Sequence, residues 1–350
     1  MINKNKKINS CYLCNSCSKK MKILTFLIPC YNVSSCVSHC IDSMLIDDIL
    51  DDIEILLIND GSKDNTLEIL HQYEAKYPTV IRVIDKENGG WGTAINLGIQ
   101  EAKGKYLKEV DADDWVSSEK LKEYVAFLKS NDIDYIATDY TEYFKADDKY
   151  IHHSYHKEIY NKPMSLNDFW NIHSDSWDFP IHAITYRTQM LRDNNIKVGD
   201  RYYGDIEYNL YPLPYVQSIC VLPINITVYF RGSDEQSTST AGYAKHYKDY
   251  AAMSQRITKF FLNAPKTLNH NLHKFIDDTI RGTIVRTYHL MMSPLYAGKA
   301  DGVKEELLKY DKWLKETNKE LYNYCGKQKK HGIPFIRIWR LTGFNLLKLR

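Results

Sequence analysis

Three carboxylates fall within four residues at Asp111-Ala112-Asp113-Asp114, directly after a short apolar run. Carboxylates this close repel one another, so the cluster is costly unless a cation or hydrogen-bond donors compensate. Hard divalent cations prefer carboxylate oxygens and commonly keep phosphate and water as their other ligands. The cluster therefore indicates a site for Mn²⁺ or Mg²⁺ beside a phosphorylated substrate. A solvated acidic turn that caps the next helix would have the same sequence.

Two further polar segments also follow apolar runs. Asn59-Asp60-Gly61-Ser62-Lys63-Asp64 combines a glycine that permits a tight turn with short side chains that can hydrogen-bond a base or ribose. Glu87-Asn88-Gly89-Gly90-Trp91-Gly92 places three glycines where a helix is expected to open, which allows the backbone to approach a ligand closely. The second segment is neither a Walker loop nor a dinucleotide fingerprint. A capping turn and a plain loop remain the alternatives.

The elements that must position these segments alternate along the first part of the chain. Short apolar runs predict strands at 22–28, 53–58, 80–84, 105–110 and 133–137, and helical spacing predicts helices at 34–45, 64–77, 93–102 and 118–128. Such alternation is typical of an α/β fold with a mostly parallel sheet covered by helices on both faces. Ligands of these sheets bind beyond the carboxyl ends of the strands. The polar segments are therefore expected to meet at one rim.

Taken in order, the motifs resemble those of glycosyltransferase family 2, whose fold is of the GT-A type. The matching residues are Ile28-Pro29-x-Tyr31-Asn32, Asn59-Asp60-Gly61-Ser62-x-Asp64, Asn88-Gly89-Gly90-x-Gly92-x-Ala94-x-Asn96-x-Gly98-Ile99, Ala102-x-Gly104-Lys105-Tyr106 and Asp111-x-Asp113-Asp114-Trp115. The resemblance is specific across 22–140 and looser up to about residue 240. It implies a mostly parallel central sheet flanked by helices, followed by a mainly helical C-terminal extension.

The resemblance also divides the chain. We expect a GT-A domain over 21–240, with a nucleotide-binding part at 21–140 and an acceptor-side part at 141–240, and a helical region over 241–350. Residues 1–20 are expected to form a disordered leader. Its Cys11, Cys14 and Cys17 could hold a metal, but a fourth ligand and a matching second pair are absent.

The function that the resemblance implies is inverting transfer of a sugar from a UDP-sugar, or another nucleotide-diphosphate sugar, to an acceptor hydroxyl. The acceptor would be a saccharide or a lipid-linked molecule in the synthesis of a cell-surface polysaccharide or glycoconjugate. The implied donor-site residues are Asp60 at the base, with Pro29, Tyr31 and Asn32 in the same pocket, Asn88, Gly89 and Gly90 in the glycine-rich loop, Asp111 at the ribose, and Asp113 as ligand of Mn²⁺ or Mg²⁺. Asp114 could share or replace this last role.

The acceptor side should supply a general base. Tyr203-Gly204-Asp205-Ile206-Glu207-Tyr208 resembles the family's late acidic motif, although Gly204 stands where a Glu is usual. Asp205 is the predicted base, with Glu207 in reserve. The two side chains would share a face on a strand but not on a helix. A helix N-cap is the structural alternative for Asp205.

Two later segments extend the resemblance. Arg231-Gly232-x-x-x-Gln236-Ser237 is similar to a segment near the diphosphate, where arginine can pair with phosphate in a bidentate manner. An ordinary surface arginine is the alternative. Trp177, Phe179 and His182 lie in a stretch that resembles the acceptor-side insert, where aromatic rings could stack on sugars or simply pack in a core.

Composition narrows the partners. The net charge of +2 gives no indication of nucleic-acid binding, and the eight cysteines lack the dense pattern of a secreted domain, which favours the cytoplasm. No run approaches the roughly 20 apolar residues of a membrane span. Residues 327–350 are basic and apolar, so they predict either peripheral contact with the inner face of the cell membrane or a helix packed on the protein.

Two rival functions remain. A sugar nucleotidyltransferase would carry a glycine-rich loop with Arg and Lys after its first strand, whereas this chain has Pro29-Cys30-Tyr31-Asn32 there. An inactive homologue that only binds carbohydrate is the other. The presence of Asp60, Asp111, Asp113 and Asp205 together argues against it.

Overall fold

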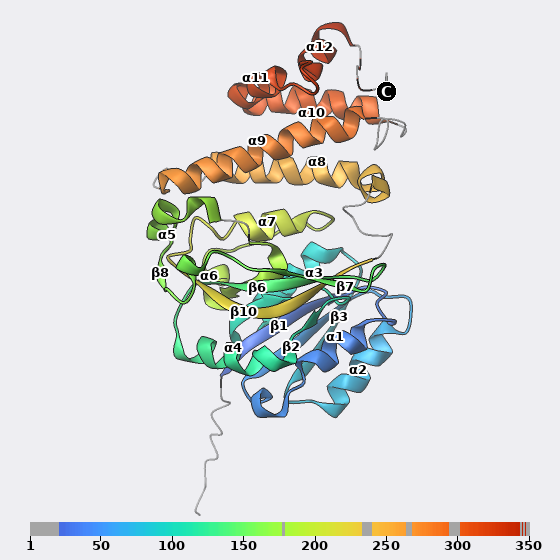
Figure 1. The fold of residues 1–350 in the computed structure, drawn as a ribbon. Helices are drawn as coiled ribbons and strands as arrows, with labels where there is room; N and C mark the ends of the chain where they lie inside the picture. Colours follow the sequence, from blue (N-terminus) through green and yellow to red (C-terminus); the bar gives the residue numbers. More distant parts are fainter. Residues whose placement is uncertain are drawn as a thin grey trace, which may run out of the picture.

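The computed structural model describes residues 21–176, 179–232, 240–263, 268–293, 302–343, 345 and 347. The expectations for the leader 1–20, for Trp177 and for Gln236 and Ser237 lie outside these ranges. A mixed sheet forms one half of the molecule, and successive layers of helices lie above it (Figure 1).

The strands are β1 (Lys22–Cys30), β2 (Ile53–Asp60), β3 (Ile81–Lys86), β4 (Gly104–Glu109), β5 (Trp115–Val116), β6 (Tyr135–Phe144), β7 (Lys149–His153), β8 (Met164–Ser165), β9 (Ile184–Arg187) and β10 (Ser218–Arg231). The helices are α1 (Val37–Met44), α2 (Thr66–Lys76), α3 (Trp91–Glu101), α4 (Ser118–Ser130), α5 (Leu166–Ile172), α6 (Thr188–Asp193), α7 (Gly204–Leu210), α8 (Thr240–Leu262), α9 (His270–Met292), α10 (Val303–Thr317), α11 (Lys319–Lys327) and α12 (Phe335–Thr342).

The sheet combines a parallel half with a mixed extension, in which β6 and β10 pair in parallel and the other strands pair antiparallel. Its order is β3-β2-β1-β4-β9-β6-β10-β5, with β7 paired to β6 and β8 to β10. Strands β3, β2, β1 and β4 are parallel, as predicted, and their carboxyl ends therefore share one rim. Strand β9 runs antiparallel between β4 and β6, and only four residues form it. A strand this short, contributed from later in the chain, leaves no periodic signal that could place it in the middle of the sheet.

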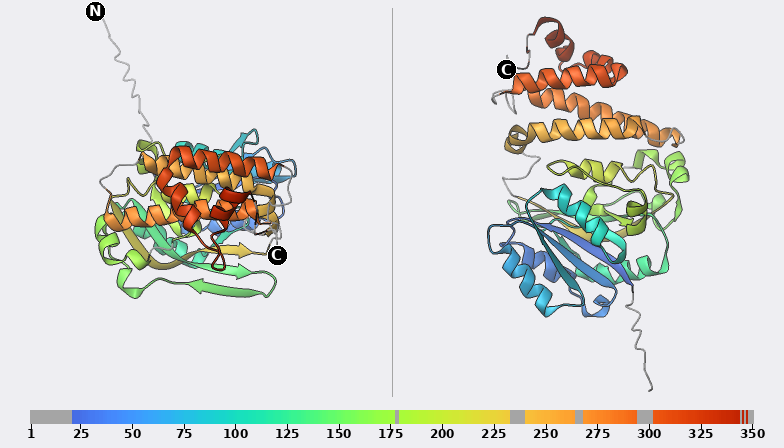
Figure 2. Two further views of the ribbon diagram at one scale, coloured as in Figure 1. Left: turned by 90° about the horizontal axis from the view of Figure 1, so that it is seen from above. Right: turned by 180° about the vertical axis from the view of Figure 1, so that it is seen from behind.

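Successive side chains of β1 point to opposite faces of the sheet and enter two different apolar cores. Phe26 and Ile28 belong to the core that α1, α2 and α4 cover, whereas Leu27 points into the core beneath α3. The second core is continuous with the helical layers, since it includes Tyr208 of α7 and Tyr250 of α8. Helix α7 lies between the sheet and α8, and α9 and α10 follow above (Figures 1 and 2).

The C-terminal helix α12 packs on protein. Phe335, Ile336 and Trp339 are buried, and the Arg340 guanidinium donates to Asp311 Oδ1 at 2.7 Å and to the Tyr322 carbonyl at 2.7 Å. The apolar side that was predicted to face either lipid or protein is therefore occupied by helices of the same chain. Within the described ranges, no helix combines the length and apolar character that crossing a bilayer would require.

Gly98 tests the packing of α3 on β1. A Cβ at this position would lie 2.2 Å from Leu27 Cδ1, so Gly98→Ala should overpack the core and lower the free energy of unfolding by about 1–3 kcal/mol. Gly282 is the matched control, because it also lies inside a helix but has nothing within 4 Å of the added Cβ. Gly282→Ala should instead stabilise by about 0.5–1 kcal/mol through helix propensity. Urea denaturation measures both, and equal stability changes would contradict the packing.

Candidate functional site

The first rim segment joins the ends of β1 and β2. Asn32 adopts a positive φ of 54°, and its side-chain oxygen accepts from the Lys63 backbone N–H at 2.8 Å. Its own N–H donates to Ser62 Oγ at 3.1 Å. Pro29 is half-buried near the end of β1, and Tyr31, two residues later, is 47% exposed. An aromatic ring is thus left open at the rim, where the sequence predicts the nucleotide pocket.

Asp60 holds the glycine-rich loop. Its Oδ1 accepts from Gly89 N at 2.9 Å and from Lys86 Nζ, and its Oδ2 accepts from Gly90 N at 2.8 Å and from Asn88 Nδ2 at 3.2 Å. The residue is 4% exposed. These bonds fill the four lone-pair sites of a carboxylate. In this structure Asp60 therefore positions the loop, and the predicted direct contact with a base would require one of these bonds to be exchanged.

The loop is fixed from its other side by close backbone packing. Gly90 has a φ of 91°, and a Cβ there would lie 2.3 Å from the Asp200 carbonyl oxygen. A Cβ at Gly92 would lie 1.7 Å from the Gly199 oxygen, and the Gly92 N–H donates to Asp200 O at 3.1 Å. Only glycine leaves room for this approach of two segments more than 100 residues apart.

The acidic cluster lies directly after β4, and its members influence one another. Burial, together with the charges of the Asp113 and Asp205 carboxylates, raises the pKa of Asp111 to about 6. The pKa of Asp113 is also raised by burial. The structure therefore brings Asp205 close to the cluster from a segment some 90 residues away in the chain.

The Asp114 side chain is buried, so it is less accessible to a metal ion than Asp113. It is 1% exposed, and its Oδ1 accepts from the Phe230 backbone N–H at 2.7 Å. Its Oδ2 is buried without a hydrogen-bond partner, and burial followed by the charge of Asp111 raises its pKa. The burial of Asp114 and its bond to β10 favour Asp113 as the accessible ligand, and the choice between the two alignments of the motif stays a prediction.

The predicted base and its reserve lie on different faces of α7. Asp205 has an exposed side chain, although surrounding protein raises its pKa. Glu207 is fully buried and accepts from Gly199 N at 2.6 Å, Tyr211 OH at 2.9 Å and Arg256 Nε at 2.6 Å. A residue with every partner inside the protein does not suit a base, so the structure argues against Glu207 in that role. The N-cap of α7 is Tyr203 rather than Asp205.

Trp91 links the parts of the site, and the sequence did not single it out. It follows Gly90, forms a side-chain hydrogen bond that lowers the pKa of Asp111, and lies so close to Gly204 that a Cβ there would be 3.0 Å from its ring. The sequence does contain a signal for this contact. Gly204 stands where the late acidic motif usually has a Glu, and the absence of a side chain leaves space that the Trp91 indole fills.

Arg231 is already paired. Its guanidinium donates to Glu142 Oε1 at 2.8 Å and lies over the Tyr229 ring at 4.6 Å. The His182 ring stacks on the Tyr229 ring at a centroid distance of 4.6 Å, and burial lowers the pKa of His182 to about 3. His182 and Phe179 are both buried, so core packing, rather than open sugar stacking, describes them.

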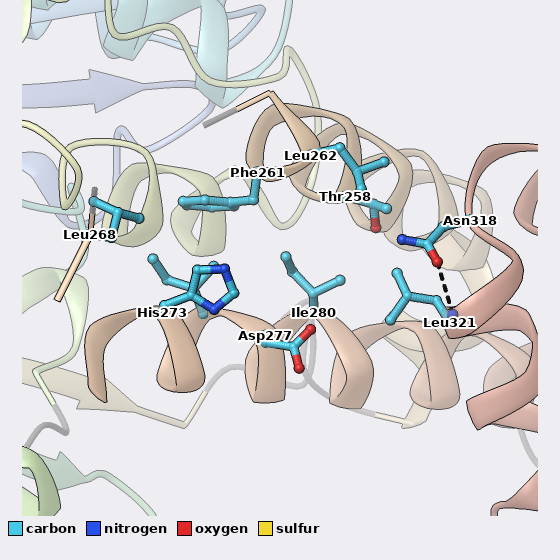
Figure 3. Close-up of a pocket in the computed structure, with 10 residues that line it drawn as sticks. Thr258, Phe261, Leu262, Leu268, His273, Asp277, Ile280, Asn318 and Leu321 are labelled. Atoms are coloured by element: carbon cyan, nitrogen blue, oxygen red, sulfur yellow. Dashed lines mark hydrogen bonds between the residues drawn. The ribbon is translucent and has the colours of Figure 1, made fainter. Parts of the chain in front are cut away.

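A separate pocket of about 260 Å³ lies in the helical layers, away from the strand ends (Figure 3). Its wall is mostly apolar and comes from Phe261 of α8, Ile276 and Ile280 of α9, and Leu321 of α11. None of the predicted site residues lines it. The chemistry that the sequence predicts therefore belongs to the rim of the sheet and not to this pocket.

The residues at the rim suit a divalent cation that is shared with a substrate. Among the described residues, no group of three or more His, Cys, Asp and Glu is arranged to hold a metal alone. Mg²⁺ commonly binds through one or two carboxylates and completes its shell with substrate phosphates and water. Asp111 and Asp113, whose pKa values are raised mainly by burial, match that requirement.

Comparisons with known proteins agree with this geometry. Residues 25–183 match the sequence model described as Glycosyl transferase family 2. The chain is 29% identical over 212 residues to the uncharacterized glycosyltransferase EpsJ of Bacillus subtilis, covering 59% of this chain and 60% of EpsJ. It is 40% identical over 117 residues to the poly(ribitol-phosphate) beta-glucosyltransferase of Bacillus spizizenii, covering 33% of this chain and 18% of that protein.

A solved structure shares the fold. S. aureus TarS 1-349 in complex with UDP-GlcNAc superposes with a TM-score of 0.57 at 18% identity, covering 86% of this chain and 83% of that one. The predicted GT-A architecture, including the helical C-terminal part, is thereby confirmed. The chain spans only 60% of the first of its curated relatives and less of the next.

The buried Lys108 should make the free energy of unfolding depend on pH. It is fully buried on β4, donates to the His182 carbonyl at 2.7 Å, and burial lowers its pKa to about 7. Since the unfolded lysine holds its proton up to about pH 10.4, the free energy of unfolding should rise between pH 7 and pH 10, by about 1 kcal/mol per pH unit. Lys108→Met should remove this rise.

Chemical denaturation across that pH range measures the slope. Lys105 on the same strand is the control, because its ammonium pairs with the exposed Asp132 at 3.3 Å and Lys105→Met should leave the slope intact. Equal slopes in the wild type and in Lys108→Met would contradict the assignment.

Proposed function

Because this chain belongs to glycosyltransferase family 2, we propose that it transfers a sugar from a UDP-sugar, or a related nucleotide-diphosphate sugar, to an acceptor hydroxyl with inversion. The observation that carries the proposal is that Asp205 of α7 lies close enough to raise the pKa of Asp111, which follows β4 and stands beside Asp113 in the chain. Carboxylates of this kind can serve a donor diphosphate on one side and an acceptor hydroxyl on the other.

The donor side would be formed by the rim loops. Tyr31 offers an exposed ring for a base, and Asp60 holds Gly89 and Gly90 where their backbone can approach the sugar nucleotide. Asp111 would face the ribose. Arg231 would reach a phosphate only after exchanging its bond with Glu142, because the guanidinium is engaged there.

Asp113 would hold Mn²⁺ or Mg²⁺, with Asp111 beside it. When bound, such a cation neutralises charge that develops on a departing diphosphate. Asp114 contributes indirectly, since its bond to Phe230 N fixes β10 against the cluster. This division of roles accounts for three adjacent carboxylates of which only two are accessible.

Asp205 would remove the proton from the acceptor hydroxyl as the hydroxyl attacks the anomeric carbon. Its raised pKa makes it a stronger base than an ordinary carboxylate, and a positioned base typically contributes about 10²–10⁴-fold to the rate. Its exposed side chain leaves the oxygen accessible to an acceptor, which the buried Glu207 does not offer.

The relatives suggest the class of donor and acceptor. One is named for transfer of glucose to poly(ribitol-phosphate), and the solved TarS structure contains UDP-GlcNAc. We therefore propose a UDP-hexose or UDP-N-acetylhexosamine donor and a cell-surface polymer or its lipid-linked precursor as acceptor, handled at the cytoplasmic side. A panel of UDP-sugars assayed for UDP release with Mn²⁺ tests this, and no release from any of them, with or without saccharide acceptors, would contradict it.

Asp205→Asn should keep donor binding and lose transfer by at least about 100-fold, because only the proton acceptor is removed. UDP release in the presence of acceptor measures transfer, and calorimetry measures donor affinity. Glu119→Gln is the control, since Glu119 is an exposed acid in the first turn of α4 on the opposite face of the sheet. Full transfer by Asp205→Asn with intact donor affinity would place the base elsewhere.

We also propose a weak peripheral contact with anionic membranes through the C-terminal region. The apolar side of α12 is buried, so the exposed Lys327, Lys329, Arg337 and Leu341 would have to make it. We expect weak co-sedimentation with anionic liposomes that falls at high salt, and none with neutral liposomes. Replacing Lys327, Lys329 and Arg337 with Gln should abolish it. Equal pelleting of wild type and triple variant would remove this surface as the contact.

A further inference from the structure

Helix α8 forms an ion pair with the predicted catalytic segment through Arg256. Arg256 donates from Nε to Glu207 Oε1 at 2.6 Å and from Nη2 to Glu207 Oε2 at 3.2 Å, a bidentate arrangement. Glu207 is fully buried, whereas Arg256 is 38% exposed. Glu207 lies two residues after Asp205 on the short helix α7, so the arginine holds the helix that carries the predicted base.

Arg256 and Glu207 also contact the loop that precedes α7. Glu207 accepts from the Gly199 backbone N–H at 2.6 Å, and a Cβ at Gly199 would lie 2.1 Å from Arg256 Nη2. The guanidinium therefore covers the Gly199 backbone, and only glycine permits that contact. Asp200, the next residue, accepts from the Gly92 N–H at 3.1 Å. A continuous set of contacts thus runs from α8 to the start of α3.

We propose that Arg256 is a positioning residue for the transfer reaction, through which the helical layer sets the place of the base Asp205 relative to Asp111. This inference rests on the proposed function, and it assigns the C-terminal helices a direct part in the rate of transfer. Arg256 touches neither donor nor acceptor; it acts through Glu207 and the 199–200 backbone.

The geometry predicts which kinetic constant should respond. Asp60 keeps its four bonds to Lys86 and the glycine-rich loop when Arg256 is lost, so the loss of Arg256 should leave donor binding nearly unchanged. Once Arg256 is lost, Glu207 keeps its bonds to Tyr211 OH and the Gly199 N–H, and aromatic rings of α8 still stack on both ends of α7, but the link from α8 to the middle of α7 is gone. A displacement of about 1 Å in a reacting group can cost about 100-fold in rate. The effect should therefore fall on kcat.

The test compares Arg256→Met, Arg256→Lys and the control Arg281→Met. Arg281 also pairs with two carboxylates, Asp277 at 2.6 Å and Glu320 at 2.8 Å, but it lies in the helical layer without contact to α7. We expect Arg256→Met to lower kcat about 10–100-fold with donor KM within about 2-fold. Arg256→Lys should recover part of kcat, because it keeps the charge and loses the bidentate fork. Arg281→Met should keep kcat.

Comparing Arg256→Met with a double variant that also carries Glu207→Gln separates an effect on the position of α7 from an effect on folding stability. Arg256→Met leaves the buried Glu207 charge unpaired, which can destabilise the protein by several kcal/mol. Adding Glu207→Gln removes that charge and should restore the thermal midpoint. If positioning is the role, kcat of the double variant stays low; recovery of kcat together with stability would overturn the proposal. A fall in kcat matched by an equal loss of donor affinity would overturn it as well.

Hydrogen–deuterium exchange gives a result that does not depend on turnover. Amides of 199–210 should exchange faster in Arg256→Met and in the double variant, but not in Arg281→Met. Unchanged exchange would refute the positioning even if the wild type transferred no sugar. A wild type without transfer would refute the proposed function alone, whereas full kcat in Arg256→Met beside an active wild type would refute the inference alone.

Discussion

The candidate site depends on carboxylates that the fold holds close together and surrounds with protein. The surrounding protein raises the pKa values of Asp111, Asp113 and Asp205, the charges of the other two acids add to the shift at Asp111, and no basic side chain appears among the principal influences on the three. The buried Lys108 lies nearer to Glu109 and Asp114 and has a lowered pKa itself. Keeping these acids in one place stores unfavourable energy that a cation with a diphosphate can relieve, which ties the protein's stability at the rim to its ligand.

The surrounding structure holds these acids in place. Parallel strands deliver their carboxyl ends to one rim, Asp60 clamps the glycine-rich loop, and Gly90 and Gly92 admit the 199–200 backbone. Trp91 fills the space at Gly204 and bonds Asp111. The apolar core continues from the sheet into α8 and α9, so the helical layers belong to the same packed unit that supports the site.

Sequence patterns predicted the first half of the fold well, because its strands and helices repeat at regular periods and its motifs follow strand ends. They missed β9, which is short and enters from the distant part of the chain. They also could not assign Asp114, Glu207 and Arg231, whose side chains pair with Phe230, Arg256 and Glu142, all remote in sequence or on other elements. Residue type and spacing located the chemistry, whereas long-range pairing decided which acids remain accessible.

The most direct test of the account is calorimetric titration of UDP with and without Mn²⁺, on the wild type and on Asp113→Asn. If the crowded acids form a cation site shared with the diphosphate, Mn²⁺ should strengthen UDP binding to the wild type by about 5–150-fold, and the variant should lose this coupling. UDP affinity that is the same with and without Mn²⁺ in the wild type, or coupling that persists in Asp113→Asn, would contradict the account.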